Sequence, residues 1–173
     1  MSQLLDFYRG DGADCDGRRL AQIWRWDDDV LETVHDFIQW LFPLPEPSPF
    51  NRRAPLLTGD DIAAFHAEPV LQANLQRSFE RILTFLGLAL AEDGRVVEGP
   101  DFAHRRRDVW DEPNHNWLRI TRIIRSTLLL GLEQQARAIY DRLRVMYDSR
   151  KYPISAETFD YWTAAIDGKV PGS

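Results

Sequence analysis

The spacing of apolar residues limits the fold of this chain more than any other feature. In every long segment where apolar residues recur regularly, they recur every three or four positions, as they do along one face of an α-helix. In residues 116–132, Trp117, Ile120 and Ile124 fall three and four positions apart, which places them on one helix face. No alternating strand of useful length appears. The chain is therefore predicted to be all-α. The same helical spacing recurs in residues 28–42, 69–88 and 133–150.

Start and stop signals divide the chain into about six helices. Asp27 can cap a helix that Pro43 ends. Thr58 and Ser155 are suited to cap two further helices, and Gly87 is suited to end the helix before it. These signals predict where the helices begin and end as well as how many there are.

One stretch lacks a helical period. Residues 91–104 are predicted to form a longer surface loop, with one short extended piece at Val96 and Val97. No Ser- or Gly-rich linker divides the chain, and no repeat is visible. We therefore predict a single globular domain over residues 1–173, with its core at about 7–165.

The composition indicates a folded protein of a reducing compartment. Hydrophobic residues make up 44% of the chain and aromatic residues 12%, which is too apolar for a disordered chain. Cys15 is the only cysteine, so an internal disulfide and a thiolate zinc site are excluded. The sequence shows no secretory signal and no apolar run long enough to span a membrane, so a cytoplasmic protein is expected. The sequence does not indicate an oligomeric state.

Charge and motifs argue against several classes of function. The net charge of −6 argues against general nucleic-acid binding, and the triplet Arg105, Arg106 and Arg107 is predicted to lie in a solvated turn. The sequence contains no HExxH, CxxC, GxSxG, GxGxxG or GxxxxGK motif. No metal site and no cofactor are predicted.

Two polar strips border two apolar helices and form a candidate site. Asp36 on the first strip is expected to pair with Arg119 or Arg122 on the second. No catalytic residue is assigned, but His35 and His115 are the candidates for acid–base chemistry, because histidine titrates near neutral pH. The same groups also fit a paired network that only fixes helix packing. The ligand-binding candidates are His35, Asp36, Gln39, Asn51, His115, Asn116, Arg119 and Arg122.

Prolines occupy every second position in residues 43–49, PLPEPSP. Such a run favours an extended path, which SH3-type domains can recognise when it is exposed. Apolar residues argue for another role, because Leu44 and Phe50 lie in or beside the run and Trp40 and Phe42 precede it. We predict a rigid strap that lies along the body of the protein.

Three stretches of the sequence carry a resemblance to a known family: HDFIQWLFPLPEPSPFNRRAPLLT, LQRSFERILTFLGLAL and HNWLRITRIIRSTLLLGLE. In this order they resemble the conserved domain of the opioid growth factor receptor family, over about residues 7–147. Animal members of that family are described as nuclear-associated receptors for a short enkephalin peptide. The resemblance implies a compact member of the family that lacks the C-terminal repeats of the mammalian receptors.

Three functions stay open at this stage. The resemblance favours a binding module whose groove, rimmed by the candidate residues, takes a short peptide or a small molecule. An arginine can hold the carboxylate of a peptide and Asp36 its amine. The alternatives are a small all-α enzyme that uses His35 or His115, which is less favoured because the same groups fit a packing network, and a scaffold protein without a pocket.

Overall fold

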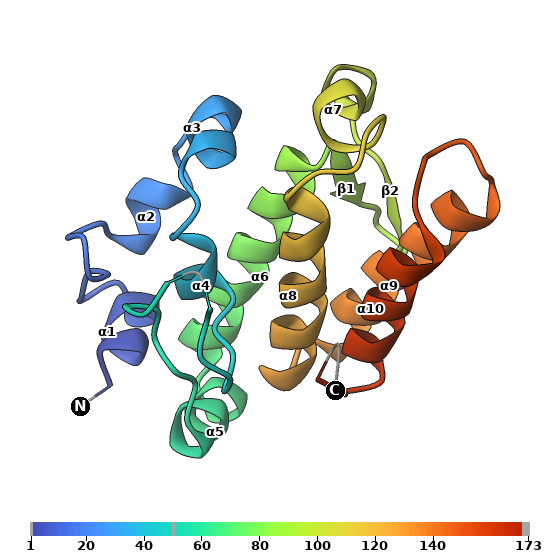
Figure 1. The fold of residues 1–173 in the computed structure, drawn as a ribbon. Helices are drawn as coiled ribbons and strands as arrows, with labels where there is room; N and C mark the ends of the chain where they lie inside the picture. Colours follow the sequence, from blue (N-terminus) through green and yellow to red (C-terminus); the bar gives the residue numbers. More distant parts are fainter. Residues whose placement is uncertain (1, 50, 171–173) are drawn as a thin grey trace. The chain divides into compact units, whose positions relative to one another are not determined.

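Helices make up most of the chain in the computed structural model, which describes residues 2–49 and 51–170 (Figure 1). Those residues form ten helices and one two-stranded sheet, so the all-α class is confirmed. The chain divides into two compact units, residues 1–78 and 79–173, and each is described by itself. Helix α6, Pro69–Phe85, belongs partly to each unit. One domain over the whole chain stays a prediction.

Aromatic contacts hold the core of unit 1 together. The Tyr8 ring lies edge-on to Phe65, with the centroids 4.9 Å apart, and Phe7 meets Trp40 in the same way at 5.3 Å. The buried Tyr8 hydroxyl donates a hydrogen bond to the carbonyl of Leu41. Burial raises the pKa of Tyr8, which keeps this donor protonated. The helices of this unit before α6 are α1 Gln3–Arg9, α2 Leu20–Ile23, α3 Asp28–Thr33, α4 Ile38–Leu41 and α5 Gly59–Ala67.

The helix predicted over residues 28–42 is wrong as one element, because it is broken between α3 and α4. Asp27 caps α3 as predicted, and its side chain accepts from the Val30 N–H at 2.9 Å. Val34 then turns extended, with φ −86° and ψ 128°. Every residue from 37 to 43 is buried. An unbroken helix buries only one stripe, so the break lets this run bury more of its side chains.

The proline segment has the period of an extended chain. Pro45, Pro47 and Pro49 are exposed, whereas the residues between them are half-buried or buried. The Leu57 N–H donates to the carbonyl of Leu44 at 3.1 Å, which ties the segment to the chain that follows it. Successive residues of the predicted strap therefore alternate between exposed and less exposed positions, as they do in an extended chain. Phe50 lies outside the described residues.

Unit 2 is built on three helices that pack on one another, α8 Asn116–Leu129, α9 Glu133–Asp148 and α10 Ala156–Ile166. The rings of Trp117 and Trp162 meet edge-on, and the Trp162 indole N–H donates to the Trp117 carbonyl at 3.1 Å. Ahead of these helices, β1 Leu88–Leu90 pairs antiparallel with β2 Val96–Glu98. Strand β2 confirms the extended piece predicted at Val96 and Val97, and it contacts α9.

Helix α7, Phe102–Val109, occupies a region predicted to be loop and solvated turn. Phe102, Arg105 and Val109 are buried together on one face of it. Arg105 donates to the Phe85 carbonyl at 2.8 Å, and its guanidinium lies 4.7 Å from the centre of the Phe85 ring. The prediction that Arg105 lies in a solvated turn was wrong. The sequence alone does not distinguish a buried arginine from an exposed one.

Replacing Trp162 with Phe tests the packing of unit 2. The change removes the indole donor and leaves a small void, so the free energy of unfolding should fall by about 1–3 kcal/mol in urea titrations. Tyr161→Phe is the matched control, because Tyr161 is half-exposed and the change should cost about 0.5 kcal/mol or less. Equal effects of the two changes would contradict the packing described here.

Candidate functional site

Asp36 of the predicted site pairs within unit 1 with Arg18, a residue that the sequence did not single out. The Arg18 Nη1 donates to Asp36 Oδ1 at 2.8 Å, and its Nε donates to Asp14 Oδ2 at 2.6 Å. Asp16 lies 3.3 Å from the same guanidinium. Arg18 thus gathers three carboxylates of unit 1 around one cation.

Burial by itself raises the pKa of Asp36, but the hydrogen bond and the positive charge of Arg18 outweigh it and hold that pKa below its ordinary value. Asp36 is therefore an anion at neutral pH. A carboxylate held in this way is suited to an ion pair rather than to accepting a proton.

The other candidates in unit 1 differ in burial. Gln39 is buried in α4, and its side-chain oxygen accepts from the Asn51 amide at 3.4 Å. Asn51 also accepts from the Arg53 N–H at 2.9 Å. His35 lies exposed in the break between α3 and α4. The structure therefore joins Gln39 to Asn51 and leaves the His35 ring on the surface.

In unit 2 the candidates cluster at the start of α8. Arg119 donates to the Asn116 side-chain oxygen at 3.1 Å, and both side chains are buried. The Arg119 guanidinium lies 6.0 Å from the centre of the Phe85 ring. His115 and Arg122 are half-buried. Because these residues and Asp36 belong to different units, one joint site, with Asp36 paired to Arg119 or Arg122, stays a prediction.

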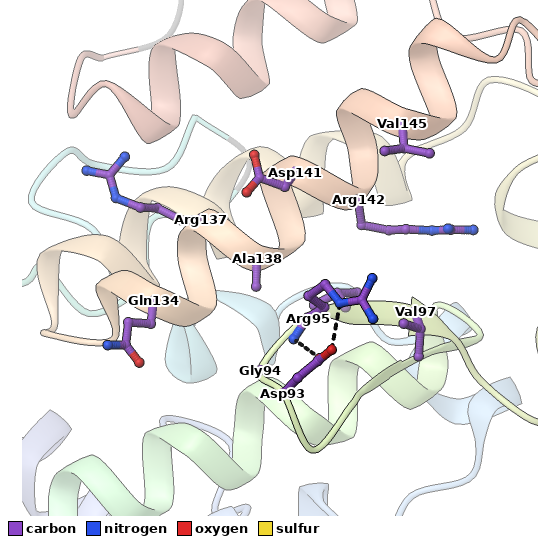
Figure 2. Close-up of a pocket in the computed structure, with 11 residues that line it drawn as sticks. Asp93, Gly94, Arg95, Val97, Gln134, Arg137, Ala138, Asp141, Arg142 and Val145 are labelled. Carbon is purple, nitrogen blue, oxygen red and sulfur yellow. Dashed lines mark hydrogen bonds and ion pairs between the residues drawn. The ribbon is translucent and has the colours of Figure 1, made fainter.

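A groove that the sequence did not reveal lies within unit 2, between the β-hairpin and α9 (Figure 2). Its volume is about 620 Å³, which is in the usual range of about 300–1,000 Å³ for ligand pockets. The lining mixes charged side chains with valine and alanine. The lining residues are Asp93, Gly94, Arg95, Val96 and Val97 from the hairpin, and Gln134, Arg137, Ala138, Asp141, Arg142 and Val145 from α9.

Ion pairs hold most of the charged groups of the groove. Arg142 donates to Glu98 at 2.7 Å and thereby ties α9 to β2. Arg95 pairs with Asp93 at 2.7 Å, and Arg137 pairs with Glu133 at 2.8 Å. The last two pairs are largely exposed, and such pairs contribute about 0–1 kcal/mol each. Their arginines can therefore turn to a bound anion at little cost.

Comparison with known proteins places the chain in a family. Residues 5–170 match the family model described as the opioid growth factor receptor (OGFr) conserved region. The chain belongs to the opioid growth factor receptor family. It is 35% identical to the opioid growth factor receptor of Mus musculus over 151 residues, which cover 85% of this chain and 24% of that protein.

Further members of the opioid growth factor receptor family give the same result. The opioid growth factor receptor of Homo sapiens is 34% identical over 169 residues, which cover 94% of this chain and 25% of that protein. Opioid growth factor receptor-like protein 1 of Xenopus tropicalis is 35% identical over 122 residues, or 68% of this chain and 23% of that protein. The chain thus spans about a quarter of the length of these relatives. No solved structure matches the chain.

Two further findings concern residues 2–49 and 51–170. In these ranges no helix combines the length and the apolar character needed to cross a membrane. The same ranges hold no group of three His, Cys, Asp or Glu side chains that could bind a metal ion.

The Asp36 ion pair predicts a dependence of stability on pH. The pKa of Asp36 is lowered in the folded state, so its contribution is present above the unfolded pKa of about 4 and is lost as the pH falls through the folded pKa. Asp36→Asn should therefore cost up to about 1 kcal/mol at pH 7, and less at lower pH, in urea titrations.

The exposed Asp160 of α10 provides the matched control, Asp160→Asn. A difference between wild type and Asp36→Asn that stays constant from neutral to acid pH would contradict the ion pair.

Proposed function

We propose that this protein is a binding module for a short peptide and that the groove between β2 and α9 receives it. The groove is the observation that carries the proposal. It offers apolar surface at Ala138, Val97 and Val145, and Val145 as a whole residue is 59% exposed. Charged groups stand on both of its walls, as a peptide with two charged ends requires.

The names of the relatives support the same class of function. The proteins of mouse and human are named opioid growth factor receptor, and the resemblance implies a short enkephalin peptide as the ligand. We carry over the receptor role and the class of ligand, a short peptide. The groove supports this proposal, because its walls carry both charged side chains and apolar surface.

We propose a structural role for the two polar clusters around Asp36 and Arg119. Asp36 pairs with Arg18, and Arg119 bonds to Asn116. Groups that are already paired near a core must lose those bonds before they bind a ligand, which costs free energy. This favours the packing network among the alternatives for these residues.

We also propose that the protein acts in the reducing interior of the cell. Cys15, the single cysteine of the chain, is free. A fold without disulfides needs no oxidising compartment.

Filling the groove tests the proposed function. Ala138→Trp places a large side chain between α9 and the hairpin, so the affinity for a bound peptide should fall about tenfold or more, equivalent to about 1.4 kcal/mol. The measurement is a calorimetric titration with an enkephalin peptide and with a pool of five-residue peptides that carry free termini. Ala103→Trp on the exposed surface of α7 is the matched control and should bind as the wild type does.

The outcomes of this titration are distinct. Binding by the wild type and by Ala103→Trp, but not by Ala138→Trp, supports the groove. If no peptide binds the wild type, or if Ala138→Trp binds as tightly as the control, the proposal is wrong. Mass spectrometry of the same samples tests the enzyme alternative, since a binding module returns the peptide unchanged.

A further inference from the structure

A smaller hollow in unit 2, which we call the α8–α10 notch, lies between those two helices. It shares no lining residue with the groove. Its volume is about 220 Å³, below the usual range of about 300–1,000 Å³ for pockets that hold a small-molecule ligand. The lining residues are Pro113 and Asn114 from the turn before α8, Trp117, Leu118 and Thr121 from α8, and Glu157, Thr158 and Tyr161 from α10.

Hydrogen bonds inside the protein hold two sides of the notch in place. The Asn114 side chain donates to the Val109 carbonyl at 3.0 Å and accepts from the Asn116 N–H at 3.0 Å. The Trp117 indole donates to the Val109 carbonyl at 2.8 Å. The turn and the α8 wall are therefore fixed by the fold, and such preorganisation lowers the cost of binding.

The notch opens beside a strongly exposed apolar side chain. Leu118 is 61% exposed, more than Val145 of the groove at 59% or Leu56 at 52%. Trp117 next to it is buried, and its ring meets that of Trp162 edge-on. A small hollow beside exposed apolar surface is typical of the centre of a protein interface, where one anchor side chain fills a pocket.

Charge on α10 selects the kind of partner. Glu157 is exposed and is the only charged residue of the lining, whereas Arg119 and Arg122 of α8 lie outside it. The Glu157 carboxylate accepts from the Tyr161 hydroxyl at 3.3 Å. Residues 152–168, which include α10, contain three acids and no lysine or arginine. Charge complementarity therefore favours a cationic group on the partner at this wall.

We propose that the α8–α10 notch is an interaction surface for a basic segment of a partner protein. One large apolar side chain of that segment fills the notch against Trp117 and Leu118, and a neighbouring lysine or arginine pairs with Glu157. A helix offers this combination when the two residues are three or four positions apart, because their side chains then share a face. The inference does not rest on the proposed function, since the groove plays no part in it.

Blocked amphipathic model helices test this proposal in calorimetric titrations. The first helix is built of leucine and lysine, the second has glutamate in place of each lysine, and the third has alanine in place of each leucine. Wild type should bind the first about tenfold or more tightly than the other two. Ala138→Trp, which fills the groove, should bind the first helix as the wild type does, so failure of the proposed function leaves this result unchanged.

Two variants and two matched controls locate the binding surface. Leu118→Ala should weaken binding of the leucine–lysine helix about tenfold, and Glu157→Gln about fivefold. The controls, Leu56→Ala and Asp148→Asn, change residues outside the notch and should bind as the wild type does. All four positions are exposed, so the variants should fold, and thermal melts check this.

Three outcomes would overturn the inference. One is equal loss of affinity in the notch variants and their controls, because binding would then follow net charge or general apolar surface. Another is equal affinity of the wild type for the three helices, or no binding of any. The third is self-association of the wild type in analytical ultracentrifugation that Leu118→Ala abolishes, which would assign the notch to a second copy of this chain.

Discussion

The attachment of the β-hairpin to α9 is the constraint on which the groove depends. Val96 buries its side chain, and the Arg142–Glu98 ion pair joins the two walls at 2.7 Å. Strand β2 contacts α9, and α9 in turn packs on α8 and α10. A two-stranded hairpin is marginal alone in water, so it keeps its position only because the helices support it. The groove is therefore a product of the packing of unit 2.

Sequence reasoning succeeded where local signals decide structure. The Thr58 and Ser155 caps are present, and Thr58 also forms a capping box with Asp61. Helices α8 and α9 begin where their apolar period begins. It failed where tertiary packing decides, because the run of residues 37–43, all of them buried, follows a break in the helix that the period alone would continue.

The candidate site was harder to predict than the fold. Asp36 pairs with Arg18, which no motif singles out, whereas the partners predicted from sequence were Arg119 and Arg122. The groove was missed because its walls are far apart in the chain and neither carries a motif. One available signal was the charged second flank of α9, where Arg137, Asp141 and Arg142 share a side opposite to the apolar stripe.

We propose that a short peptide binds between β2 and α9, and intermolecular nuclear Overhauser effects test this binding most directly. The groove carries methyl groups on Val97, Ala138 and Val145, whereas Leu56 and Leu118 carry exposed methyl groups outside it. With methyl-labelled protein and an unlabelled peptide, contacts to the first group are predicted. Contacts to Leu56 or Leu118 without any to the groove would contradict the account.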